Sequence, residues 1–286
     1  MPSLPRVVSV VVGASLRRVF ELVVQFVVAP LLVLAASLAA RWWGHGIAGV
    51  VSAFPAIVGP VLLIGAHRHG ASFAAQQATG TLLGLAALSG FALAYARTAL
   101  HASWPVSVAA GWAVAAVAAG LAGAVGASLL GALVTAVASL VLAHRGIPRA
   151  MLGKLPLEPP ASDLALRMAL TALLVVSLAA VAGWLGPTVG GVLTALPVLA
   201  CILAAFTHER YGAAAAAQLL RGMLSGMGGF VVFCLLVAAL VDDAGVTVTF
   251  MAATGAALCT QAAVAWASTR SLRAGRPAGL AGDGVT

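Results

Sequence analysis

The 286-residue chain is 62% hydrophobic, has only 8% charged residues and carries a formal net charge of +8 at pH 7. A soluble globule needs a more polar exterior, so this composition excludes a soluble domain and predicts an integral membrane protein. The apolar runs last about 20 residues and are rich in Ala, Leu and Gly, which predicts spanning helices. A transmembrane barrel would instead alternate over strands of about 10 residues. The basic residues lie mostly in short loops and tails, where they set orientation, so we expect no nucleic-acid partner.

The first half of the chain begins with a short basic segment, residues 1–18, followed by a membrane repeat over 19–124. Its four spans are predicted at 20–40, 46–66, 71–96 and 104–122. An uncharged apolar run over 126–143 is long enough for another crossing, so we expect a linker span over 125–144. A polar, proline-containing loop over 145–162 marks the boundary between the halves.

The second half repeats this plan over residues 163–268 and ends in a basic, glycine-rich tail, 269–286, that we expect to be disordered. Its spans are predicted at 164–185, 189–206, 213–240 and 246–267.

An internal duplication underlies this division. The stretch from Gly49 to Gly84 returns without a gap from Gly191 to Gly226, 142 positions later. Shared apolar composition does not explain matched proline, arginine, glutamine and spaced glycine, so we interpret the match as a true repeat. The matched pairs are Pro55 with Pro197, Arg68 with Arg210, Gly70 with Gly212, Gln76 with Gln218 and Gly80 with Gly222.

The expected fold is an all-α polytopic membrane protein of two homologous four-helix repeats. Four spans, a linker span and four more spans give about nine. Equivalent spans of the two repeats are then an odd number of crossings apart, so the second repeat is inverted relative to the first. Eight spans are the alternative. The distribution of Lys and Arg favours eight with the N-terminus inside, whereas hydrophobic length favours nine.

Pro55 and Pro197 lie in the middle of predicted spans. A proline removes one helical hydrogen bond, and in lipid the freed carbonyl needs a partner in protein or in a water-filled cavity. Broken helices at matching positions of two halves indicate a midplane binding site, although a plain proline kink is the simpler alternative. The substrate-path candidates are Gly49, Ser52, Pro55, Gln76, Gly191, Thr194, Pro197 and Gln218, with the two glutamines alternatively serving as contacts between helices.

Charged residues near the span ends supply the remaining candidates. Arg68 and Arg210 have guanidinium groups that suit a phosphate or carboxylate, or that anchor the chain at lipid headgroups. Glu21 and Asp163 are candidates for proton coupling, the alternatives being an ion pair for Glu21 and a helix N-terminal role for Asp163.

No sequence motif indicates catalysis, and we expect no enzyme activity, metal or cofactor. The histidines near Arg68 and Arg210 differ in spacing between the copies, and the cysteines Cys201, Cys234 and Cys259 stand singly in apolar runs. We expect these thiols to pack as small apolar groups.

The pattern GxxxxFP followed by RxG resembles the GlpM-like family of small bacterial membrane proteins. Gly49–Pro55 with Arg68–Gly70 fits this pattern, and Gly191–Pro197 with Arg210–Gly212 fits it again, Leu196 replacing the Phe. The resemblance covers about 60 central residues of each half. It implies a four-span unit and residence in the bacterial inner membrane, but no substrate.

Together these features predict a small secondary transporter for a small metabolite or lipid-linked molecule in the bacterial inner membrane. The alternative is a non-catalytic subunit that supports envelope or exopolysaccharide assembly, and a membrane enzyme acting on lipid-linked substrates ranks third. The expected partners are the lipid bilayer and an unknown substrate, with a homodimer as one possible assembly.

Overall fold

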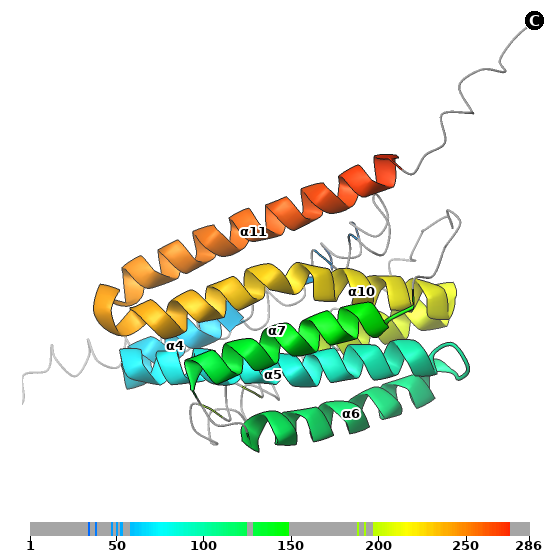
Figure 1. The fold of residues 1–286 in the computed structure, drawn as a ribbon, viewed down its shortest axis with the longest axis horizontal. Coiled ribbons are helices and arrows are strands. Elements are labelled where there is room, and N and C mark those ends of the chain that lie inside the picture. The colour runs from blue at the N-terminus through cyan, green and yellow to red at the C-terminus, as the bar shows by residue number, and fades with distance from the viewer. Residues whose placement is uncertain are drawn as a thin grey trace, which may run out of the picture.

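The computed structural model describes residues 58–124, 128–148 and 197–274, together with the single positions Leu34, Leu38, Ile47, Val50, Ser52, Ala53, Thr188 and Val192. This part of the chain is helical and contains no strand (Figure 1). Its helices are α4 (Val58–His69), α5 (Ala71–Thr98), α6 (Trp104–Ala124), α7 (Leu129–Gly146), α10 (Val198–Ala244) and α11 (Val246–Ala274).

Five of these six helices, all except α4, are long and apolar enough to cross a membrane. Helix α5 has 28 residues, which at about 1.5 Å per residue exceeds the roughly 30 Å of a bilayer's hydrocarbon core. Beyond its first turn, the backbone amides of a helix are satisfied within the helix itself, which lipid requires. The chain is therefore an α-helical membrane protein with several crossings.

Three glycines with positive φ interrupt the helices: Gly70 (96°), Gly212 (83°) and Gly245 (78°). Their ψ values of 170°, 171° and 160° place them in a region of backbone conformation that is essentially restricted to glycine. Gly212 divides α10 into a short arm, residues 198–211, and a long arm, residues 213–244. Figure 1 shows the chain reversing direction between α4 and α5 and again within α10.

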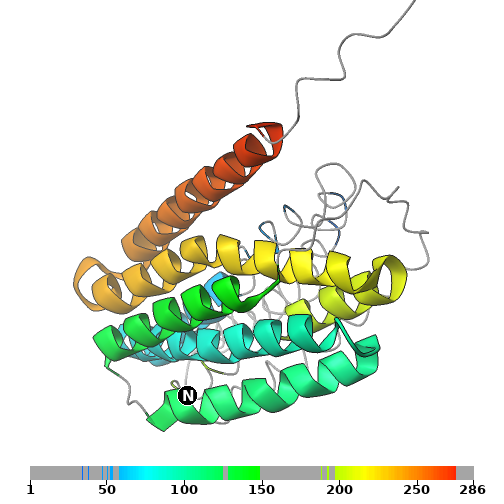
Figure 2. The ribbon, with the colours of Figure 1, turned by 45° about the vertical axis from the view of Figure 1, so that its right-hand side comes forward.

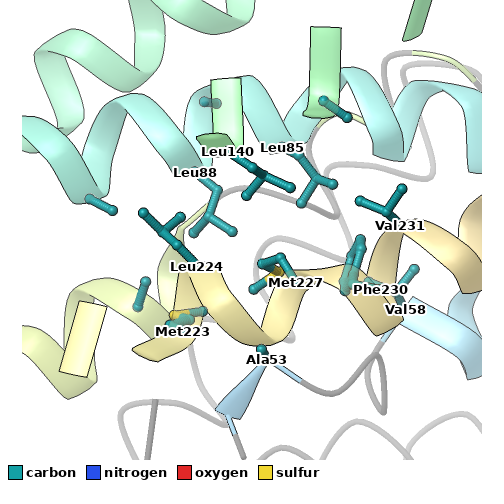
Figure 3. Close-up of a cluster of buried hydrophobic side chains, with 14 of the residues drawn as sticks. Ala53, Val58, Leu85, Leu88, Leu140, Met223, Leu224, Met227, Phe230 and Val231 are labelled. Carbon is teal, nitrogen blue, oxygen red and sulfur yellow. The ribbon is translucent and has the colours of Figure 1, made fainter. Parts of the chain in front are cut away.

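Helix α5 and the long arm of α10 form the centre of the bundle and run antiparallel to each other (Figures 1 and 2). In the most hydrophobic window of α5, 83% of the residues are buried. Leu85 and Leu88 of α5 lie close to Met227 and Val231 of α10, with Leu140 of α7 beside them (Figure 3). Because lipid tails are as apolar as these side chains, close packing rather than water exclusion holds the pair together.

The helices α6, α7 and α11 lie on the outside. Only 22%, 22% and 28% of their most hydrophobic windows are buried, which leaves most of each helix surface to the bilayer. The large apolar side chains that these outer faces expose are Trp104, Val106, Val114, Val117, Leu121, Leu130, Val134, Val137, Val141, Leu142, Val248, Met251, Leu258 and Trp266.

The predicted spans agree with the described helices in most of their bounds. The span predicted at 71–96 is α5, the span at 104–122 is α6 and the linker span is α7. The tail expected to be disordered from 269 is helical as far as Ala274, so that boundary was wrong by six residues. The described part of the chain does not show nine spans, and the spans predicted at 20–40 and 164–185 lie almost entirely outside it.

Candidate functional site

The helix predicted over 189–206 is interrupted at its proline. Pro197 is buried and has a non-helical ψ of 40°, and α10 begins directly after it. Its carbonyl accepts the amide of Cys201 at 2.7 Å and so starts the helical ladder. In the first half, Ser52 is helical and Ala53 is a turn residue, and α4 is described from Val58 onward. Of the two expected breaks, only the one at Pro197 lies within the described residues.

Two glycine contacts join each half of the chain to the other. A Cβ atom on Gly226 of α10 would lie 2.7 Å from the Cβ of Ala53 and 2.8 Å from the carbonyl oxygen of Val50. A Cβ atom on Gly80 of α5 would overlap the carbonyl oxygen of Thr188. Only glycine permits these approaches. The chain before each proline thus packs against the long helix of the opposite half, and Figure 3 shows Ala53 beneath α10.

Gln261 of α11 reaches the same place. Its Nε2 donates a hydrogen bond to the carbonyl oxygen of Val50. Its Oε1 lies 3.0 Å from the position that a Cβ atom on Gly229 would occupy. The Oε1 atom is buried and has no hydrogen-bond donor. This amide escaped the sequence analysis because its counterpart 142 positions earlier is Ala119. A polar side chain inside an apolar span is the signal that identifies it.

The two adjacent glutamines of α5 have opposite environments. Gln76, which the duplication selected, is exposed on the outside of the bundle, whereas Gln77 is buried with only 7% of its surface accessible. The Oε1 of Gln77 packs against Gly65 of α4 and has no hydrogen-bond donor. Gln218, the counterpart of Gln76, is half-buried. The inward-facing amide of α5 is therefore Gln77, since successive helical residues point about 100° apart.

The matched arginines lie at helix ends. Arg68 is exposed in the last turn of α4, and Arg210 is exposed two residues before Gly212. At the Gly212 end, His208 meets the Tyr95 hydroxyl at 3.3 Å, so this corner packs against the C-terminal end of α5. Since Gly70 lies at the opposite end of α5, the structure separates the two arginines by about the length of that helix.

Arg221 contacts the end of a neighbouring helix through its guanidinium group. It lies inside α10, half-buried, and donates to the carbonyl oxygens of His144 at 2.6 Å and Ile147 at 2.8 Å. Arg97 of α5 donates to the carbonyl of Gly146 at 3.2 Å. Two guanidinium groups, one from each half, therefore satisfy the last carbonyls of α7 and meet the negative end of its dipole.

The remaining candidates fall partly outside the described residues. Ser52 and Pro197 are buried within the bundle. Gly49, Pro55, Gly191, Thr194, Glu21 and Asp163 lie outside the described residues. In the part of the chain that the structure describes, no group of His, Cys, Asp or Glu is placed to hold a metal ion.

The site that emerges is the crossing at which Val50 and Ala53 contact Gly226 of α10 and Val50 contacts Gln261 of α11. There the Val50 carbonyl accepts from the Gln261 amide, both of them uncharged, and Ser52 is buried nearby in the sequence. Comparison with protein-family models, curated proteins and solved structures finds no match to this chain.

Proposed function

We propose that the chain is a small secondary transporter of the bacterial inner membrane, built from two inverted four-helix repeats and a linker span. Its path for a small metabolite or lipid-linked molecule runs between the repeats at the proline-broken helices. It needs no catalytic group or cofactor. The GlpM-like resemblance agrees with this membrane and with a four-span unit, and nine spans is the count that the proposal requires.

The observation that carries the proposal is the antiparallel arrangement of equivalent helices. Helices α6 and α11 begin 142 positions apart, at Trp104 and Val246, as do the corners at Gly70 and Gly212. Burial follows the same offset: the inward faces are Ser107, Gly111 and Ala115 in α6 and Thr249, Ala253 and Ala257 in α11. Antiparallel equivalents support inverted repeats, in which broken helices surround a central site.

The exchange of contacts between the halves adds further support. Val50 of the first half packs on Gly226 of the second, and Thr188 of the second half packs on Gly80 of the first. Each broken stretch therefore rests on a helix of the other repeat. Rocking one repeat against the other changes both crossings at once, which is the motion that alternating access requires.

Cysteine labelling tests the orientation. In a variant with Cys201, Cys234 and Cys259 replaced by alanine, Arg68→Cys and Arg210→Cys are introduced separately and treated with an impermeant thiol reagent in intact cells. We expect labelling of one position only in intact cells and of both after permeabilisation. Equal labelling of both in intact cells contradicts inverted repeats.

Access to the centre tests transport more directly. Ser52→Cys, buried at 3% exposure, is treated with a small water-soluble thiol reagent from either side of oriented membrane vesicles. A permease exposes this position to each side in turn, so we expect slow labelling from both. The native Cys234, which is fully buried in helix packing, is the control and stays unlabelled.

Flux is then measured in proteoliposomes loaded with amino acids, sugar phosphates, nucleosides and carboxylates, with release followed by mass spectrometry. We expect faster release of at least one compound than from protein-free vesicles. Retention of every compound, together with a Ser52→Cys that stays unlabelled from both sides, favours the non-catalytic envelope subunit instead.

A further inference from the structure

We propose that Arg97 of α5 and Arg145 of α7 bind the headgroup of one anionic phospholipid in the cytoplasmic leaflet. The two arginines adjoin the same helix end, at the more basic end of the bundle. Binding of this lipid does not depend on transport.

The arginines that the structure describes are distributed unevenly between the two ends of the bundle. The C-terminal ends of α5 and α7, the N-terminal end of α6 and the corner within α10 lie together at one end, on the right in Figure 1. This basic end carries one described acid, Glu209, against four arginines: Arg97, Arg145, Arg210 and Arg221. The opposite end carries one described arginine, Arg68, against Asp242 and Asp243. Because cytoplasmic ends of membrane proteins carry an excess of Arg and Lys, we assign the basic end to the cytoplasmic side.

The C-terminal end of α7 brings Arg97 and Arg145 close to each other. Arg97 reaches this end from α5 and donates from Nε to the Gly146 carbonyl oxygen at 3.2 Å. Its Nη2 lies 3.6 Å from the position that a Cβ atom on Gly146 would occupy. Arg145 is the residue before Gly146, and both arginine side chains are exposed. Because these side chains are long and flexible, one phosphate can contact both guanidinium groups.

The carbonyl groups at the end of α7 do not repel such a phosphate, because arginines already bind them. The last carbonyls of a helix carry partial negative charge. Arg221 donates to those of His144 and Ile147, and Arg97 donates to that of Gly146. Arg97 makes this contact through Nε, and its Nη1 and Nη2 form no hydrogen bond with the described residues. They are donors that suit a phosphate.

The outer face of α7 favours a lipid over a soluble anion. It exposes large apolar side chains at helical spacing: Leu130, Val134, Val137 and Val141. Arg145 follows Val141 by four residues and therefore lies on the same face. An acyl chain can lie along this apolar stripe while the phosphate stays at the arginine. A soluble phosphate would use the arginines alone.

Trp104 indicates that this end lies at the level of the headgroups. It begins α6 at the basic end and is exposed. Tryptophan is enriched where the hydrocarbon meets the headgroups. Arg97 and Arg145 therefore lie near the phosphates of the bilayer, where basic groups between helices bind anionic lipids.

Lipid binding is measured by native mass spectrometry of the full-length protein, delipidated in a neutral detergent and titrated with phosphatidylglycerol or phosphatidylcholine. We expect one phosphatidylglycerol per chain, bound more tightly than phosphatidylcholine. Arg145→Gln and Arg97→Gln each weaken phosphatidylglycerol binding about fivefold, and the double variant weakens it about 25-fold. Arg97→Gln also removes a contact with α7, so Arg145→Gln, which leaves the carbonyl contacts in place, is the decisive variant.

The matched control is Arg68→Gln, the same substitution at the opposite end of the bundle, which keeps wild-type binding. Equal binding of the two lipids overturns the site, as does a loss in Arg68→Gln as large as in Arg145→Gln. Glycerol phosphate that displaces phosphatidylglycerol at equal concentration identifies a soluble anion and overturns the lipid.

The leaflet is tested with the cysteine variants at Arg68 and Arg210, which lie at opposite ends of α5. We expect the impermeant reagent to label Arg68→Cys in intact cells and Arg210→Cys only after permeabilisation. Labelling of Arg210→Cys in intact cells overturns the cytoplasmic placement. Phosphatidylglycerol binding without flux leaves the lipid site in place and contradicts only the transporter.

Discussion

Gly70 and Gly212 have nearly the same backbone conformation, φ 96° and ψ 170° against φ 83° and ψ 171°, although 142 residues separate them. Each ends a helix and starts a longer one, and a Cβ atom at either position would meet nothing within 4 Å. At both corners, glycine is therefore required by the backbone conformation and not by a lack of space for a side chain. Two such corners at opposite ends of an antiparallel helix pair support the proposal of inverted repeats.

Alanine at either corner destabilises the protein. Because the conformation is nearly exclusive to glycine, we expect Gly70→Ala and Gly212→Ala each to lower the free energy of unfolding by about 1–3 kcal/mol. Unfolding in detergent with increasing SDS measures this loss. Gly120→Ala is the control, since Gly120 lies on an open helical surface, and there alanine gains about 0.5–1 kcal/mol. An equal change in the free energy of unfolding for all three alanine variants contradicts the view that the backbone at Gly70 and Gly212 requires glycine.

Arg221 ties α7 to α10, so its loss frees the end of that helix. Arg221→Met removes two charge-assisted hydrogen bonds to the His144 and Ile147 carbonyls, and we expect a loss of about 1.5–3 kcal/mol. Hydrogen exchange of α7 amides and unfolding in SDS report the change. Arg145→Met, on the exposed side of the same helix, serves as the control with an effect of about 0.5 kcal/mol or less. Unchanged exchange in Arg221→Met argues against this contact.

Gly226 maintains the crossing between the halves. Gly226→Ala forces a methyl group against Ala53 and the Val50 carbonyl at 2.7 and 2.8 Å, and overpacking of this kind costs about 1–3 kcal/mol. We expect a lower unfolding midpoint and slower labelling of Ser52→Cys. Gly255→Ala, which faces open space in α11, leaves both unchanged. A Gly226→Ala protein as stable as wild type, with unchanged labelling, contradicts the crossing.

Cys259 reports the depth of α11. It is exposed near the middle of a helix whose outer side is apolar, so in a bilayer it faces lipid. A spin label on Cys259, in a variant with the other two cysteines replaced by alanine, should collide often with oxygen and rarely with a polar nickel chelate. A label at Arg145→Cys, at the exposed end of α7, should show the reverse. Equal access of the chelate to both labels places α11 outside the hydrocarbon.

The sequence by itself determined the class of protein and the positions of most helix ends. Apolar length predicts crossings because lipid requires every backbone amide to be satisfied within its own helix. Glycine and proline mark the ends because their backbone restrictions are local, and Gly70, Gly212 and Pro197 all stand at such ends. These properties depend on neighbours in the sequence and need no knowledge of the fold.

Only the tertiary structure decided which polar groups face inward. Gln76 and Gln77 are adjacent in an apolar span, and the choice between them depends on where α4 lies against α5. Gln261 has no matched partner, so the duplication could not select it, yet it reaches a carbonyl 211 residues away. The carbonyls that Arg221 binds lie at the end of another helix, so the sequence around Arg221 could not reveal them either. Contacts between distant segments depend on how helices pack. In a membrane, helix surfaces that face lipid and those that face other helices are both apolar, so the sequence pattern says little about that packing.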